Sequence, residues 1–175
     1  MTKKIILGLD PGTCITGYGI ISVEREITVK DVGVVKPPSG LPMPERIHRI
    51  YVFLEELVEK HRPQTAVLEK LYAHALHPAT APVIGHVRGV ICLLCMQKKI
   101  ELIEYSVKRV RQNLTGNGNA TKEQTRQFVC GQLGLDAATL TLDASDALAL
   151  ALGYVNMNSA VTAGDAQEGS RRPQR

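Results

Sequence analysis

The chain has no tryptophan, and its 175 residues include only two phenylalanines and five tyrosines. A hydrophobic core built from this sequence must therefore be mainly aliphatic. No apolar run approaches the roughly 20 residues of a membrane-spanning helix, and the N-terminal residues MTKKII lack the apolar segment of a secretory signal. These absences predict a soluble protein of the reducing cytoplasm that does not enter a membrane.

Cysteine is scarce as well, with four residues at positions 14, 92, 95 and 130. Cys92 and Cys95 form a CxxC pair inside the apolar run VICLLCM, and there is no second pair. Because a zinc site of this type needs two such pairs or added histidines at regular spacing, buried helical cysteines are the favoured interpretation. His74, His77 and His86 do not share one predicted helix or strand, which also disfavours zinc.

Positive charge is only slightly in excess, with a formal net charge of +4. Such a balance permits a nucleic-acid partner without requiring one. The length suits one α/β domain with a proper core. From Ser159 onward the residues become small, polar and finally basic. We therefore expect a folded domain over residues 1–158 and a disordered basic tail over 159–175.

Short apolar segments and helical periodicity alternate along the chain. Strands are predicted at residues 4–9, 17–23, 27–35, 65–69 and 100–106, and helices at 45–60, 83–97, 107–114, 121–133 and 140–156. The short polar link 24–26 predicts a hairpin, so the first three strands form an antiparallel meander. The strand at 65–69 follows a helix, which predicts a right-handed crossover parallel to the first strand. The expected fold is a five-stranded mixed α/β sheet flanked by helices.

Four acidic residues lie at positions where a charge needs a balancing partner. Asp10 and Glu69 each end an apolar strand, at the edge where ligands gather in open α/β sheets. Asp143 and Asp146 are three residues apart, on one face near a predicted helix N-terminus. If all four converge, hard divalent cations such as Mg²⁺ or Mn²⁺ could balance them, and a metal pair about 3.5–4 Å apart suits phosphodiester hydrolysis. The alternative is four unrelated surface acids and helix caps, which is strongest for Asp146.

Basic residues form a second candidate set, which could bind phosphates or form only a solvated face. They are Lys108, Arg109, Arg111, Lys122 and Arg126. Tyr72, in the loop after the fourth strand, could stack on a base or be an ordinary loop tyrosine. Gly17 and Gly19 are interpreted as a tight entry to the second strand.

Five motifs occur in the order of one family. They are GLDPGT and TGYG within residues 8–19, LEKLY at 68–72, GHVRGV at 85–90, GNGNATKEQ at 116–124 and DASDALALAL at 143–152. Together they resemble the RuvC-type Holliday junction resolvases over nearly the whole chain up to about residue 158. The resemblance implies an RNase H-like fold and a homodimer that binds four-way junction DNA. It also implies paired symmetric nicks that leave 5′-phosphate and 3′-hydroxyl ends, with the RuvA and RuvB branch-migration proteins as partners.

The resemblance also implies roles for single residues. The acids Asp10, Glu69, Asp143 and Asp146 match the family's metal-binding set, for two Mg²⁺ ions per site with Mn²⁺ as a substitute. Lys122 matches the essential lysine, and Arg111 stands where the family often has lysine. Tyr72 would help to open the junction, and the apolar helix at 83–97 would supply part of the dimer interface. His86 stands where glutamine is usual.

Other classes remain open from the sequence. A different RNase H-like nuclease, such as an RNA–DNA hybrid nuclease or an exonuclease, would share the acids, and a binding-only protein would hold junctions without cutting them. Actin-like and sugar-kinase ATPases share a similar first glycine loop but need two domains and a second phosphate loop. This chain is too short for that arrangement.

Overall fold

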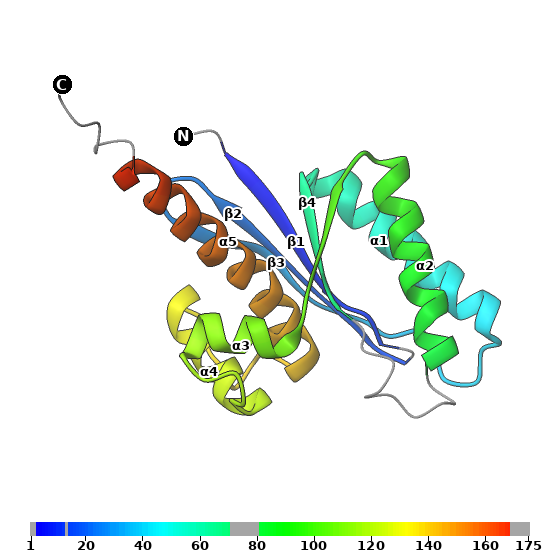
Figure 1. The fold of residues 1–175 in the computed structure, drawn as a ribbon. Helices are drawn as coiled ribbons and strands as arrows, with labels where there is room; N and C mark the ends of the chain where they lie inside the picture. Colours follow the sequence, from blue (N-terminus) through cyan, green and yellow to red (C-terminus); the bar gives the residue numbers. More distant parts are fainter. Residues whose placement is uncertain (1–2, 13, 71–80, 169–175) are drawn as a thin grey trace, which may run out of the picture.

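One mixed sheet organises the computed structural model, which describes residues 3–12, 14–70 and 81–168. Its five strands run in the order β3-β2-β1-β4-β5 (Figure 1). They are β1 (Lys4–Asp10), β2 (Thr16–Val23), β3 (Ile27–Val35), β4 (Thr65–Glu69) and β5 (Glu101–Tyr105). The first three strands pair antiparallel, and β4 and β5 continue the sheet in parallel with β1. The predicted mixed sheet is confirmed.

Helices cover both faces of the sheet (Figure 1). On one face lie α1 (Met43–His61) and α2 (Ala81–Gln97), and on the other lie α3 (Val107–Thr115), α4 (Lys122–Leu133) and α5 (Leu142–Glu168). A capping box opens α4, with Thr121 and Gln124 each accepting the other's backbone N–H. Among the described helices, none combines the length and apolar character needed to cross a membrane.

Strand alternation decides which face each residue of β1 and β4 joins. Ile5, Leu7 and Leu9 belong to the core under α1 and α2, whereas Ile6 and Val67 belong to the core under α3–α5. Asp10 follows Ile6 by four residues and Glu69 follows Val67 by two. Both acids therefore emerge on the face that α5 covers.

Glycines let α5 lie directly on β1 and β2. Gly8 pairs with Gly19 across the two strands. A Cβ added to Gly8 would lie 1.9 Å from the main-chain oxygen of Ala147, and one added to Gly17 would lie 2.1 Å from that of Asp143. Gly17 and Gly19 lie in the first residues of β2, consistent with their interpretation as a strand entry. They also allow the α5 backbone to approach the sheet, a contact between distant segments that local sequence does not reveal.

The end of α5 also differs from the prediction. The expected disordered tail begins at Ser159, but the helix continues to Glu168. Extending a helix that already exists avoids the cost of nucleation, and alanines at 160, 163 and 166 favour it. The helix therefore runs past the expected boundary at 158. Residues 169–175 lie outside the described part, and one domain over residues 1–158 stays a prediction.

Gly8→Ala should destabilise the protein by about 3 kcal/mol, because the new methyl group would collide with the rigid backbone of α5. Gly131→Ala is the matched control, since a Cβ at this exposed glycine of α4 meets nothing within 4 Å. Alanine there should stabilise the protein by up to about 1 kcal/mol through its helix propensity. Urea denaturation measures both variants, and equal stability would contradict the close contact.

Candidate active site

Three carboxylates and two cations line one pocket of about 270 Å³. The acids are Asp10, Glu69 and Asp146, and the bases are Arg111 and Lys122. They come from β1, β4, α5, α3 and α4, so five separated elements each supply one charged side chain. The structure thus brings together three of the four predicted acids and two of the five predicted basic residues at this pocket.

Lys122 is the cation that contacts the acids most closely. Its Nζ lies 2.5 Å from Oδ2 of Asp146, whose side chain is largely buried. Because Lys122 is the first residue of α4, the capping box at Thr121 fixes the start of the helix and with it the lysine's position. Burial lowers the pKa of Lys122, but its hydrogen bond to Asp146 and the charges of Asp146, Asp10 and Asp143 together raise it above the usual value.

The pKa of Asp10 is raised from 3.8 to about 7, first by burial and then by the charges of Asp146, Glu69 and Asp143, against a smaller opposing effect of Lys122. Burial and the charge of Asp146 likewise raise the pKa of Glu69, while Lys122 and Arg111 act in the opposite direction. The cations present therefore do not balance the acids.

Asp143 lies near this cluster without lining the pocket. Its charge raises the pKa values of both Asp10 and Lys122, and its main-chain oxygen contacts the sheet at Gly17. Asp10 thus interacts with each of the other three predicted acids, although Asp143 stands at the margin.

The donor chemistry of the pocket fits a hard divalent cation. Its possible ligands are carboxylate oxygens, and among the described residues neither histidine nor cysteine lines it. Within residues 3–12, 14–70 and 81–168, however, no three His, Cys, Asp or Glu side chains are close enough to hold an ion as they lie. Binding would therefore require the carboxylates to move inward and Asp146 to loosen its contact with Lys122.

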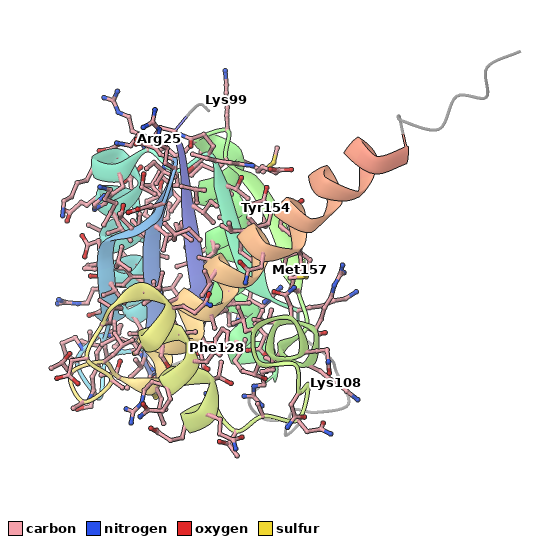
Figure 2. All side chains as sticks on the ribbon, turned by 90° about the vertical axis from the view of Figure 1, so that its left-hand side faces the viewer. Arg25, Lys99, Lys108, Phe128, Tyr154 and Met157 are labelled. Atoms are coloured by element: carbon pink, nitrogen blue, oxygen red, sulfur yellow. The ribbon has the colours of Figure 1, made fainter. Side chains whose placement is uncertain are left out.

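The remaining predicted DNA-binding residues lie elsewhere. Lys108 and Arg109 are exposed on α3, and the Arg109 guanidinium lies 5.0 Å from the ring centre of Tyr105. Figure 2 places Lys108 at the end of the molecule opposite Arg25 and Lys99. Arg126 is used internally, since it pairs with Glu123 and donates to the main-chain oxygen of Leu140. Tyr72 falls outside the described residues.

The prediction missed the uncharged wall of the pocket. Thr125, Ala149 and Leu150 line it together with Val107 and Val110. Helical spacing could have identified four of them. Val107 precedes Arg111 by four residues, and Thr125 follows Lys122 by three. Ala149 and Leu150 follow Asp146 by three and four, so each of the four shares a helix face with a predicted site residue.

Comparison with known proteins identifies what this arrangement resembles. Residues 6–154 match the family described as crossover junction endodeoxyribonuclease RuvC. A relative of that description from Rhodopirellula baltica is 38% identical over 86% of this chain and 85% of its own. The Thermus thermophilus RuvC structure matches with a TM-score of 0.81 at 28% identity, covering 90% of this chain and 97% of that chain.

A second Thermus thermophilus RuvC structure, in complex with Holliday junction substrate, matches with a TM-score of 0.79 at 25% identity, covering 90% of this chain and 96% of that chain. RuvC structures have an RNase H-like fold, so the predicted fold class is confirmed.

Without divalent cations, the free energy of unfolding should fall as the pH rises from 5 to 8. An Asp10 carboxyl with a folded pKa of about 7 and an ordinary pKa of 3.8 opposes folding once it ionises. The penalty starts to develop above 3.8 and is complete above about 7. Asp10→Asn should reduce the fall and be the more stable protein at pH 8. Urea denaturation in chelator at each pH measures this.

Glu55→Gln is the control for that experiment. Hydrogen bonds from Lys98 and Tyr51 hold the pKa of Glu55 below its usual value, so Glu55 stays ionised throughout this pH range. The variant should shift stability equally at every pH. An Asp10→Asn protein with the wild-type pH slope would contradict the assignment of a strained carboxylate cluster.

Proposed function

Because the chain belongs to the RuvC family of crossover junction endodeoxyribonucleases, we propose that it resolves four-way (Holliday) junctions in DNA recombination and repair by paired, symmetric nicks. The family consists of metal-dependent nucleases. The observation that carries the proposal is the pocket in which Asp10, Glu69 and Asp146 face Lys122 and Arg111. An acid cluster that its own cations leave unbalanced suits metal-assisted cleavage of a phosphodiester.

We assign the metal-binding role to Asp10, Glu69, Asp143 and Asp146, and propose Mg²⁺ as the metal, with two ions per site and Mn²⁺ as a substitute. If held by these acids, Mg²⁺ would supply activation of the attacking water and stabilisation of the leaving 3′ oxygen. The protein itself supplies a pocket with an apolar wall, which excludes competing water and strengthens the electrostatic interactions inside. The products would carry 5′-phosphate and 3′-hydroxyl ends.

Lys122 has the position and charge to bind the scissile phosphate. Lys122 lies 2.5 Å from Asp146; with the charge of Asp146 balanced by a cation, the lysine would be free to donate to a phosphate oxygen instead. Arg111 would contact the same phosphate or its neighbour, because its planar guanidinium presents two parallel donors. The proposed DNA surface extends to Lys108 and Arg109 on α3, with Arg126 and Tyr72 as the remaining assignments.

The exposed face of α2 supports a homodimer. Leu93 and Met96 are 54% and 77% exposed there. Gly85 and Gly89 lie on the same face, and a Cβ at either would meet nothing within 4 Å. Internal packing therefore does not require these glycines, whereas a second helix could approach closely at them. A two-fold dimer would place two identical sites on the two equivalent strands of a junction.

The wider setting follows from the proposed reaction. A junction resolvase would work in the cytoplasm, where the bacterial chromosome lies, and its expected partners are the RuvA and RuvB branch-migration proteins. The rival assignments are another RNase H-like nuclease and a junction-binding protein without activity. Substrate preference separates all three.

Cleavage of labelled DNA tests the function directly. With Mg²⁺, the wild-type protein should nick a four-way junction at symmetric positions and leave linear duplex and RNA–DNA hybrid intact. Asp10→Asn should lower the cleavage rate by at least about 1000-fold, because it removes a charge that interacts with every other acid of the site. Its junction binding, measured by gel shift, should persist.

Glu123→Gln serves as the control in that assay, since Glu123 neighbours Lys122 in α4 but pairs with Arg126. It should cut at nearly the wild-type rate. Cleavage of hybrid alone would favour a different nuclease, and binding of junctions without cleavage by the wild type would favour a binding-only protein.

Leu93→Glu should convert the dimer to a monomer, because the interface would have to bury an unpaired charge. Sedimentation equilibrium measures the mass directly. Leu142→Glu is the matched control: this leucine is 39% exposed, at the start of α5 on the opposite face of the sheet. Both variants as dimers would argue against an interface at α2.

A further inference from the structure

Arg88 of α2 connects this helix to the catalytic edge of the sheet. Its side chain is only 12% exposed. One guanidinium nitrogen, Nη1, donates to the main-chain oxygen of Glu69 at 2.5 Å, and Nη2 pairs with the carboxylate of Glu104 on β5. A nearly buried arginine thus bridges the ends of two adjacent strands, one of which carries a proposed metal ligand.

Among the described strands, the backbone at Glu69 is paired on one side only, with β5. The ladder between β4 and β1 ends at the pair Leu9–Leu68, one residue before Glu69. On the other side, β5 pairs with β4 as far as Tyr105, whose oxygen accepts from the amide of Lys70 at 2.7 Å. Arg88 supplies a further hydrogen bond, at the carbonyl of the functional residue itself.

We propose that Arg88 is a positioning residue that holds Glu69 in the active site and couples α2 to the catalytic centre. Its planar guanidinium presents donors in a fixed fork, so it can bind the Glu69 carbonyl and the Glu104 carboxylate together. Glu104 orients the fork and balances its charge. A lysine could satisfy either acceptor but could not hold both in that geometry.

The position of Arg88 in α2 would link the active site to the proposed dimer contact. Gly85 and Gly89 flank it in sequence and lie on the exposed face proposed for the dimer contact. A displacement of α2 on dimerisation would move Arg88 and so the carbonyl of Glu69. The metal site of each protomer would then depend on correct packing of α2. This inference rests on the proposed nuclease function.

Divalent-cation affinity tests the proposal, with Mn²⁺ binding followed by electron paramagnetic resonance in the absence of DNA. Arg88→Met should weaken Mn²⁺ binding by roughly tenfold, as expected when a group supporting a metal ligand is lost. It should raise the Mg²⁺ concentration for half-maximal junction cleavage by a similar factor, with much of the rate recovered at high Mg²⁺. Arg88→Lys should fall between wild type and Arg88→Met.

Two matched variants separate positioning from general stability. Glu104→Gln keeps an acceptor for Arg88 but removes the balancing charge, so it should weaken Mn²⁺ binding less than Arg88→Met does. Lys98→Met removes ion pairs to Glu55 and Glu59 just beyond α2, away from the pocket. It should lower thermal stability without changing Mn²⁺ affinity.

Wild-type Mn²⁺ affinity and Mg²⁺ dependence in both Arg88 variants would overturn the positioning role. The same holds if Lys98→Met weakens Mn²⁺ binding as much as Arg88→Met does. Failure of the wild type to cut junctions, with Mn²⁺ affinity still lowered by Arg88→Met, would refute the nuclease assignment and leave the role of Arg88 standing.

Discussion

The contact between the backbone of α5 and the glycines of β1 and β2 is the constraint on which this structure depends. Without side chains at Gly8 and Gly17, main-chain oxygens of α5 reach the sheet surface. This depth of packing brings the first turns of α5, with Asp143 and Asp146, beside Asp10 at the end of β1. A helix seated farther out would leave a sheet with two isolated acids and no cluster.

The acid cluster lowers the stability of the folded protein when no cation is bound. Burial and mutual repulsion raise the pKa of Asp10 to about 7, and Lys122 offsets only part of that repulsion. Such a site is destabilising in the free protein and becomes favourable when positive charge arrives. This cost is offset by the rest of the fold. The stabilising features are the aliphatic cores on both faces of the sheet and the capped helices α3 and α4. The same excess of negative charge would attract a cation, and Lys122 could then exchange Asp146 for a phosphate.

Two layers of helices serve this site in different ways. The layer of α3, α4 and α5 supplies its charged groups and apolar wall directly. The layer of α1 and α2 reaches it from the other side of the sheet through Arg88, which binds the main chain of Glu69. An interface on the outer face of α2 would therefore lie one side chain away from the active site, which offers a physical route from assembly to activity.

Local pattern determined the strands, the capping box at Thr121 and the shared sheet edge of Asp10 and Glu69, because alternation, capping and strand ends depend on residues close together in the chain. Tertiary structure decided the rest. The backbone of α5 packs against Gly17, and the main-chain oxygen of Leu140 accepts a hydrogen bond from Arg126. Arg88 gives no local signal, since its partner is a backbone carbonyl 19 residues away. These roles are set by packing between distant segments, which local sequence patterns do not specify.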